Sequence, residues 1–411
     1  MAQIKAFKCV RPRKELASKI AALPYDVYSS KEAREVVEDN PLSFLRIDRA
    51  ETQFDKYVQS SADCVYEKAH DLLESMIEDG YLITDEDDAY YIYELTMDGR
   101  SQAGIVACAS IDDYENGVIK KHENTRIEKE LDRIRHVDSC NAQTGPIFLT
   151  YRSLASVNEL VNKKRQERPL YDFTSEDGVR HSVWKIADQE SVQMITDTFA
   201  GISQIYIADG HHRAASAVKV GRKRREEHPG YTGKEEFNYF LSVLFPHDQL
   251  KIMDYNRVIS DIRTRTLSQF LRDVQRRFDV ELKDGPYSPQ KKGEIGMYLG
   301  RKWYCIRLQP QYYTDDPVDG LDVSILQNNL LDPYLGIEDP ARNKRIDFVG
   351  GIRGLGELER RVKEGMMVAF SMYPTSIEEL FAVADAGKLM PPKSTWFEPK
   401  LRSGLFIHKL E

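Results

Sequence analysis

Residues 205–220, IYIADGHHRAASAVKV, join an apolar, strand-like run to a helix-like run that contains several alanines. The apolar run stops at Asp209, and Gly210 then permits a sharp turn. Small side chains let the following helix approach a sheet closely, and a second apolar run at 237–245 can form another strand. The segment therefore predicts a strand, a turn, a helix over about 211–226 and a further strand.

Three basic or titratable side chains, His211, His212 and Arg213, stand where this helix is expected to begin. The first turn of a helix carries unsatisfied N–H groups and the positive end of the dipole, so cations are disfavoured there without a negative partner. Asp209 alone does not balance them. A helix start after a glycine turn binds anions, and Arg213 adds a bidentate fork for phosphate or carboxylate. Asp209 can orient a histidine, hold a metal ion or take a proton from a hydroxyl.

A purely structural interpretation of the same turn is also available. In that interpretation Asp209 caps the helix, one histidine is a hydrogen-bonded core residue, and Arg213 pairs with a surface acid. Each residue taken alone fits this interpretation. Four polar residues within five consecutive positions at such a turn favour a functional site.

Length and charge limit the class of protein. The 411 residues suggest two or three domains. A change in the sequence pattern near residue 250 predicts a boundary there, between domains 1–250 and 251–411. The net charge of −8 disfavours a surface devoted to nucleic acid or anionic membrane. The five cysteines form no C-x-x-C pair, which is typical of a reducing compartment, and no apolar run reaches about 18 residues. We therefore expect a cytoplasmic protein without a membrane partner; the sequence does not indicate its oligomeric state.

Strand-like and helix-like segments alternate along most of the chain, which predicts an α/β or α+β fold. The strand, turn and helix at 205–226 would belong to a mixed-sheet first domain, and residues 251–411 would form a second α/β domain. Near the N-terminus, Ser29 followed by Glu32 is a capping-box pattern and predicts the start of a helix that ends before Pro41.

A second polar helix start is expected in KKHENTRIEKELDRIRH, residues 120–136. Thr125 and Glu128 have the spacing of a capping box. Ile127, Leu131 and Ile134 share one helical face, and the basic residues on another are Arg126, Lys129 and Arg133. A solvated charged face is the simpler interpretation. His122 and Glu123 beside this start repeat the pattern of the first turn, so two such helix ends together would make a pocket for a polyanion.

Two further segments leave both interpretations open. Gly350, Gly351, Gly354 and Gly356 surround Arg353 without forming a P-loop or a dinucleotide fingerprint, so a tight strand-to-helix turn is favoured. Near the C-terminus, PPKSTWFEPKLRSG gathers basic and hydroxyl side chains around two aromatic residues. This segment is either a docked tail or part of a site.

The stretch DGHHRAASA resembles the strand–loop–helix signature of the ParB/sulfiredoxin superfamily, whose Gly-x-x-Arg turn binds nucleotide phosphates. Sulfiredoxins have Gly-Cys-His-Arg, so His211 replaces the reactive cysteine and sulfinic acid repair is not expected. Partition proteins have Gly-Glu-Arg-Arg, and the missing Glu argues against a CTP switch of that type. Free-serine kinases have Asp-Gly-x-His-Arg, which implies catalytic roles for Asp209 and His212 and phosphate binding for Arg213.

A broader resemblance covers nearly the whole chain. The segments LPYDV, NPLSFLRI, KHENTR, AQTGPIFLTY, ADGHHR, LDVSILQ and STWFEPKLRSGL resemble the bacterial and archaeal family known as domain of unknown function 1015. The name of that family implies no reaction, so the chemistry has to be inferred from the site.

The first functional hypothesis is phosphoryl transfer on a small hydroxylated metabolite, by resemblance serine or phosphoserine, as a kinase or a phosphatase. Arg213, Arg126 and Lys129 would surround the phosphoryl oxygens, and Asp209, His212 and Glu123 would act on the hydroxyl or water. The other predicted phosphate contacts are Gly210, His211, His122, Thr125 and Arg133. Mg²⁺ is the expected helper, and ATP or ADP are the candidate nucleotides.

The alternative is a nucleotide-binding, ParB-like regulatory or DNA-associated protein without turnover. No helix-turn-helix with a basic recognition helix is evident, and the basic run KVGRKRREEH ends at once in Glu226 and Glu227. Nucleic acid is therefore not the expected partner. A metabolite-sensing domain without turnover is a third, weaker hypothesis.

Overall fold

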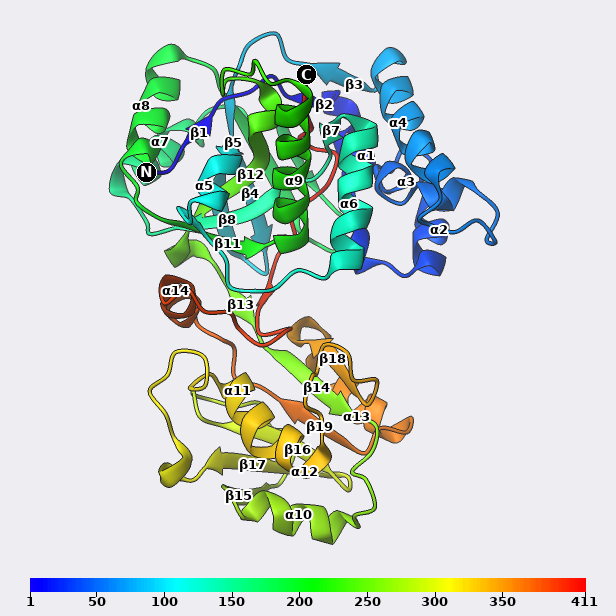
Figure 1. Cartoon of the computed structure of the whole chain (residues 1–411), viewed down its shortest axis with the longest axis vertical. Helices are drawn as coiled ribbons and strands as arrows, with labels where there is room; N and C mark the ends of the chain where they lie inside the picture. The colour runs from blue at the N-terminus through cyan, green and yellow to red at the C-terminus, as the bar shows by residue number, and fades with distance from the viewer. The chain divides into compact units, whose positions relative to one another are not determined.

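The chain forms two compact units in the computed structural model, which describes residues 1–411 (Figure 1). The first unit comprises residues 1–120, 125–250 and 399–411, and the second comprises residues 121–124 and 251–398. Two short segments, 121–124 and 399–411, therefore differ from the expected division at residue 250. Short segments of ordinary composition carry no local signal of the unit in which they pack.

A nine-stranded mixed sheet forms the centre of the first unit. Its strands pair in the order β6-β11-β8-β12-β5-β4-β10-β9, and β1 also pairs with β5. Pairs β6·β11 and β8·β12 are parallel and the others are antiparallel. The strands are β1 (Ile4–Lys5), β4 (Tyr90–Met97), β5 (Arg100–Ser110), β6 (Ile119–Lys120), β8 (Ile147–Tyr151), β9 (Tyr171–Thr174), β10 (Arg180–Ile186), β11 (Ile205–Asp209) and β12 (Tyr239–Pro246).

Helices α5 (Ile111–Glu115), α7 (Ala155–Lys164), α8 (Gln189–Ala200) and α9 (His211–Glu227) contribute to the main core of this unit. Ile105, Leu149 and Ile207 alternate along their strands with residues of the opposite face, as the two-residue period of a strand requires. Ala214 and Ala217 of α9 lie in the same core. The expected strand, turn, helix and strand are confirmed. The small side chains of the helix allow it to pack closely on the sheet.

A smaller core in the first unit lies beneath the remaining helices. They are α1 (Ala17–Ile20), α2 (Ser30–Asp39), α3 (Leu45–Asp48), α4 (Asp63–Glu78) and α6 (Ile127–Cys140). Ser29 caps α2 and forms the expected reciprocal capping box with Glu32. Short strand pairs join β2 (Val10–Pro12) to β3 (Leu82–Thr84) and β7 (Ala142–Gln143) to β21 (His408–Lys409).

The second unit is built on a six-stranded, wholly antiparallel sheet in the order β15-β17-β16-β19-β14-β18. These strands are β14 (Tyr255–Ile259), β15 (Phe278–Lys283), β16 (Ile295–Leu299), β17 (Lys302–Leu308), β18 (Ile346–Gly350) and β19 (Val368–Ser371). A short pair joins β13 (Ile252–Met253) to β20 (Trp396–Phe397). Its helices are α10 (Leu267–Gln275), α11 (Asp322–Leu326), α12 (Asp332–Leu335), α13 (Gly354–Lys363) and α14 (Ile377–Asp385). The chain is thus a mixed α/β protein whose second sheet is of the antiparallel, α+β kind.

The glycine-rich turn at 350–356 joins β18 to α13. Gly354 has a φ of 69°, which favours glycine, and a Cβ on Gly350 would lie 3.0 Å from the indole of Trp396. Leu358 of α13 packs in a core cluster with Val258 and Val349. Close packing thus accounts for Gly350 and backbone conformation for Gly354, in agreement with the interpretation as a tight turn.

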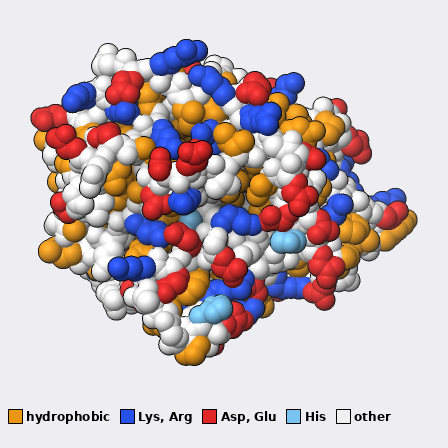
Figure 2. All heavy atoms as spheres, turned by 90° about the horizontal axis from the view of Figure 1, so that it is seen from above, with side chains coloured by type: hydrophobic (Ala, Val, Ile, Leu, Met, Phe, Trp, Pro, Cys, Tyr) orange, Lys and Arg blue, Asp and Glu red, His pale blue; other side chains and the backbone are white.

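Charged side chains of both signs are interspersed on the face shown in Figure 2. No broad basic region is visible on that face, so it lacks the extended positive surface that a nucleic-acid backbone requires. None of the helices combines the length and apolar character needed to cross a membrane.

Asp322, in the second unit, gives a testable pH dependence of stability. It is buried at the start of α11, where both carboxylate oxygens accept from the Gly293 N–H at 3.0 Å, and burial raises its pKa to about 6. Because the unfolded group has a pKa of about 3.9, the folded state retains a proton that the unfolded state loses between these values. Stability should therefore fall as pH rises from about 4 to about 6, by up to about 3 kcal/mol.

The substitution Asp322→Asn should remove this pH dependence, since the amide oxygen still accepts from Gly293 but does not ionise. Urea unfolding at pH 4 and pH 7.5 measures the effect. We expect the variant to be the more stable protein at pH 7.5 and the difference to shrink toward pH 4. Parallel pH dependences in the two proteins would contradict the assignment.

Candidate functional site

The turn between β11 and α9 has the geometry of an open helix start. Asp209 ends β11, Gly210 adopts the left-handed conformation with φ 92°, and α9 begins at His211. A Cβ on Gly210 would lie 3.2 Å from Nε and Nη2 of Arg213, so the arginine side chain folds back over the glycine. No side chain caps this end of α9. The absence of both a cap and a Cβ leaves the first turn accessible to a ligand.

Asp209 is held between a backbone amide and a lysine. Its Oδ1 accepts from the Gly210 N–H at 2.9 Å, and its Oδ2 lies 3.1 Å from Nζ of Lys400. Burial alone would raise the pKa of Asp209, but the positive charges of Lys400 and Arg213 outweigh it and hold that pKa well below its ordinary value. The side chain remains 37% exposed. Asp209 is therefore an anion at neutral pH that a ligand can still reach.

Arg213 has one protein acceptor: its Nη1 donates to the carbonyl oxygen of Pro146 at 2.7 Å. No carboxylate oxygen lies within 4 Å of its guanidinium nitrogens. Asp209 is nevertheless near enough for the positive charge of Arg213 to help lower the pKa of that aspartate. A guanidinium has five N–H donors in a planar fork. Most of the donors of Arg213 are therefore available to an anionic ligand.

His212 joins the two helix starts that the sequence singled out. Its Nε2 accepts from the backbone N–H of Arg126, the residue before α6, at 2.9 Å. Farther along, the Ser216 hydroxyl donates to the carbonyl of Glu130 at 3.0 Å, and Lys219 forms an ion pair with the same glutamate. An Nε2 that accepts a hydrogen bond places the proton of the neutral ring on Nδ1. His212 therefore cannot accept a further proton at Nε2 while this contact is present.

The start of α6 differs from the sequence-based prediction. Arg126, not Thr125, is the N-cap, and no side chain caps the helix. The Thr125 hydroxyl instead donates to the carboxylate of Glu130 at 2.7 Å, so the predicted capping box with Glu128 is wrong. The inner face of α6 meets polar groups of α9, and this tertiary contact outweighs the local capping preference.

The predicted apolar face of α6 is confirmed only in its later part, where Ile134 packs against an apolar cluster. Ile127 is 76% exposed and Leu131 is 54% exposed, whereas Glu130 and Arg133 are buried. Arg126 and Lys129 are exposed, so Arg133 is separated from the two basic residues with which the sequence grouped it. Buried polar side chains of α6 thus lie beside a polar pocket, while its later turns pack on apolar clusters.

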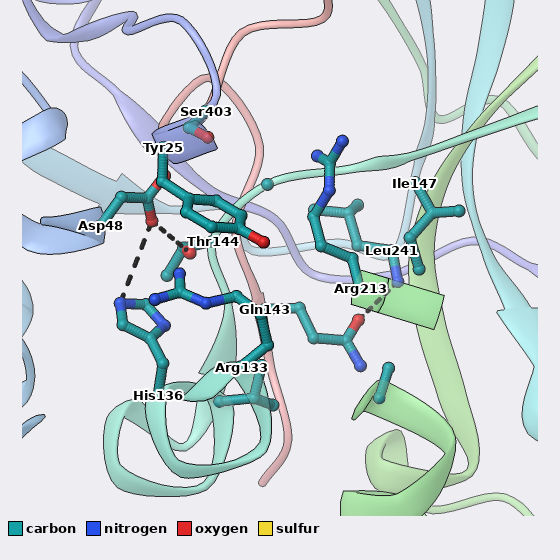
Figure 3. Close-up of a pocket in the computed structure, with 13 residues that line it drawn as sticks. Tyr25, Asp48, Arg133, His136, Gln143, Thr144, Ile147, Arg213, Leu241 and Ser403 are labelled. Atoms are coloured by element: carbon teal, nitrogen blue, oxygen red, sulfur yellow. Dashed lines mark hydrogen bonds and ion pairs between the residues drawn. The ribbon is translucent and has the colours of Figure 1, made fainter. Parts of the chain in front are cut away.

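That pocket lies beside Arg213 and contains about 30 Å³ of open space, close to the volume of one water molecule (Figure 3). Arg133 also lines it, paired with Asp132 at 2.8 Å and placed 4.0 Å from the centre of the Tyr25 ring. In Figure 3 the Tyr25 ring lies between the two arginines. The pocket is therefore rich in hydrogen-bond donors, but has room only for a water-sized group.

One carboxylate, Asp48, is found among the residues lining the pocket. Its Oδ1 accepts from the Thr144 hydroxyl at 2.8 Å and lies 4.0 Å from Nε2 of His136. Burial and then the charge of Arg133 lower the pKa of His136 to about 4, so this ring is neutral at physiological pH. Because Arg133 is already paired with Asp132, Arg213 is the lining arginine without a carboxylate partner.

Several residues of this region were missed by the sequence-based prediction. They are Tyr25, Thr144 and Ser403, which line the pocket. Lys400, which pairs with Asp209, lies in the C-terminal segment that the sequence left open as a docked tail or part of a site. The segments that contain them, LPYDV, AQTGPIFLTY and STWFEPKLRSGL, carried the broader resemblance and were the available signal. Nothing in their local pattern indicates that they meet the turn at Asp209.

The remaining polar residues of the singled-out segments belong to both units. His211 is buried at the start of α9. His122 and Glu123 belong to the second unit, where the His122 carbonyl accepts from the Met390 N–H at 2.7 Å. Arg402 belongs to the first unit and contacts Asp177 and the ring of His181, away from Asp209. The structure thus brings together the turn at 209–213 and the start of α6 within the first unit.

The fold and the site define a two-unit mixed α/β protein with an uncapped helix start beside Asp209. Residues 4–324 match the family described as "Protein of unknown function (DUF1015)", and the chain belongs to that family. No curated protein matches it.

Three solved structures show distant similarity. A variant of a free serine kinase in complex with ADP is 14% identical, with 74% of this chain and 92% of that chain covered and a TM-score of 0.38. A conserved hypothetical protein from Pyrococcus furiosus is 15% identical, with coverages of 74% and 94% and a TM-score of 0.37. SbnI with a C-terminal truncation, from Staphylococcus aureus, is 12% identical, with coverages of 71% and 82% and a TM-score of 0.37.

Replacement of the turn glycine tests the open helix start. Gly210→Ala should destabilise the first unit by about 1–3 kcal/mol, because alanine is strained at φ 92° and its Cβ meets Arg213. Gly99→Ala is a matched control: Gly99 also has a positive φ, 77°, but a Cβ there meets nothing within 4 Å. Urea unfolding and phosphoserine calorimetry should show the larger loss for Gly210→Ala in both. Equal effects of the two substitutions would mean that the contact with Arg213 is unimportant.

Proposed function

We propose that the first unit catalyses phosphoryl transfer to or from a small hydroxylated metabolite. The observation that carries the proposal is the fork of Arg213, which has one main-chain acceptor and no carboxylate within 4 Å, at an uncapped helix start beside an anionic Asp209. Positive charge around the phosphoryl oxygens and a group that acts on the attacking oxygen are the two requirements of this reaction.

In this proposal Arg213 and the first turn of α9 bind the phosphoryl oxygens. Asp209 orients the hydroxyl or water and receives its proton as the new bond forms. A low pKa does not disqualify it, because the transition state of phosphoryl transfer is loose and requires little base strength. We give His212 a positioning role in this proposal, because its Nε2 accepts from the backbone N–H of Arg126 at the start of α6.

The substrate class is proposed from the turn itself. Asp-Gly-His-His-Arg resembles the Asp-Gly-x-His-Arg turn of free-serine kinases, so serine and phosphoserine are the first candidates. ATP or ADP would be the nucleotide of a kinase and Mg²⁺ would accompany its phosphates, whereas a phosphatase would use water. Glu123 as a second acid, and His122, Lys129 and Arg126 as further phosphate contacts, remain predictions from the sequence.

Calorimetry and a product screen test the proposal in sequence. Titrations with ATP, ADP, CTP and phosphoserine, each with Mg²⁺, should give heat with at least one ligand. Phosphate release from phosphoserine is then measured beside serine phosphorylation by ATP or ADP. Nucleotide binding without any turnover would favour the regulatory alternative, and no heat with any ligand would contradict the anion site.

A further inference from the structure

The last segment of the chain, residues 399–411, returns to the first unit after the whole of the second unit; we call it the C-terminal strap. Its backbone pairs at three places, where Ser403 bridges Ala22, Ile407 bridges Val10, and β21 pairs with β7. The family match ends at residue 324, before the strap begins. Backbone pairing fixes the strap on the first unit independently of its side chains.

Two strap lysines form ion pairs in different surroundings. Nζ of Lys400 lies 3.1 Å from Oδ2 of Asp209, and its side chain is only 16% exposed. Lys409 pairs with Glu74 of α4 instead of a residue of the turn, and its side chain is 26% exposed. The strap therefore offers one lysine at the candidate site and one as an internal control.

The pair formed by Lys400 accounts for the availability of Arg213. Asp209 and Arg213 are close enough for the arginine charge to lower the pKa of the aspartate, yet no carboxylate oxygen lies within 4 Å of the guanidinium. Both oxygens of Asp209 are engaged elsewhere, by the Gly210 N–H and by Lys400. Without Lys400, the carboxylate could turn toward Arg213 and occupy the fork that a phosphate needs.

We propose that Lys400 is a positioning residue that holds Asp209 away from Arg213 and so keeps the arginine fork open to an anionic ligand. The inference deepens the proposed function and rests on it for the identity of the ligand. It makes the C-terminal strap part of the site, with Lys400 acting through Asp209 rather than by touching the substrate.

The test compares phosphoserine binding, by calorimetry, in the full-length parent and four variants. Lys400→Met should weaken binding about tenfold or more, because the carboxylate of Asp209 then competes for Arg213. Lys400→Arg should restore binding, and Lys409→Met should bind like the parent. The double variant Asp209→Asn/Lys400→Met should recover most of the affinity, because the competing carboxylate is gone. A loss that arose only from a loosened strap would not be recovered by a change at Asp209.

Each outcome separates the inference from the proposed function. Unchanged affinity in Lys400→Met, equal loss in Lys409→Met, or a double variant as weak as Lys400→Met overturns the role of Lys400. A parent that binds phosphoserine but turns over neither serine nor phosphoserine contradicts the proposed function and leaves the binding comparison decisive for Lys400. A parent that binds no phosphoserine overturns the role of Lys400, whereas the proposed function is contradicted only if ATP, ADP and CTP also give no heat.

Discussion

Asp209→Asn is expected to lower turnover by about 10²–10⁴ while leaving ligand affinity within a few-fold of the parent. The amide keeps an oxygen to accept from the Gly210 N–H, so the turn should persist, but it cannot receive the proton of the attacking hydroxyl or water. Steady-state kinetics and calorimetry on the same preparation measure the two effects. Turnover is normalised to the folded fraction, because the substitution leaves Lys400 without its carboxylate partner.

The aspartate Asp138 provides a matched control for this change. It also pairs with a lysine, Lys223 of α9, at 2.5 Å, but lies at the other end of that helix. Asp138→Asn should leave turnover unchanged. A normal rate in well-folded Asp209→Asn would remove Asp209 from the reaction and leave it as a helix-start residue.

Arg213→Ala is expected to weaken phosphoserine or nucleotide binding by about ten- to more than a hundredfold, the equivalent of losing a charge-assisted contact of about 1.5–3 kcal/mol. Its guanidinium donates to the carbonyl of Pro146, and most of its remaining hydrogen-bonding capacity is available to a ligand. Arg222→Ala is a control on the same helix, since that side chain is exposed and paired with Glu115. Calorimetry should show a loss for Arg213→Ala alone.

The two substitutions also distinguish function from a structural role of the turn. If the turn only caps a helix, both changes should lower the melting temperature, and activity should follow the folded fraction. If the site acts as proposed, Arg213→Ala mainly changes affinity and Asp209→Asn mainly changes rate. Melting temperatures measured beside both parameters separate the two cases.

Local chemistry made part of the fold predictable. The strand ending at Asp209 and the helix beginning at His211 follow from an apolar run, a glycine turn and an alanine-rich segment, and the structure has β11 and α9 there. The helix after Ser29 was predictable for the same reason, because a capping box involves residues only three positions apart.

Tertiary contacts explain the features of α6 that its local sequence pattern did not predict. The amphipathic period of α6 predicts that Ile127, Leu131 and Ile134 face inward. Ile134 packs against an apolar cluster as predicted, but Ile127 and Leu131 are exposed, and the polar Glu130 and Arg133 are buried. The ordinary rule that apolar residues face the core holds only where the core is apolar. Likewise, Thr125 finds Glu130 rather than completing a capping box.

The candidate site was predictable where its residues are contiguous. Asp209, Gly210 and Arg213 occupy one turn, so the sequence alone predicts that their side chains and backbone lie together. Lys400 lies 191 positions beyond Asp209, and an ion pair at that separation has no signature in composition or spacing. The polar pocket is likewise assembled from distant segments, and only the fold brings them together.

The most direct test of phosphoryl transfer monitors the phosphorus-containing substrates and products by ³¹P NMR. ³¹P NMR time courses on the full-length protein with Mg²⁺ would monitor phosphoserine alone, phosphoserine with ADP, and serine with ATP or ADP, each beside Asp209→Asn. The site predicts that the parent converts at least one mixture, seen as growth of inorganic phosphate, phosphoserine or a new nucleotide signal, and that the variant does so at least about a hundredfold more slowly. Spectra that remain unchanged with the folded parent in every mixture would contradict it.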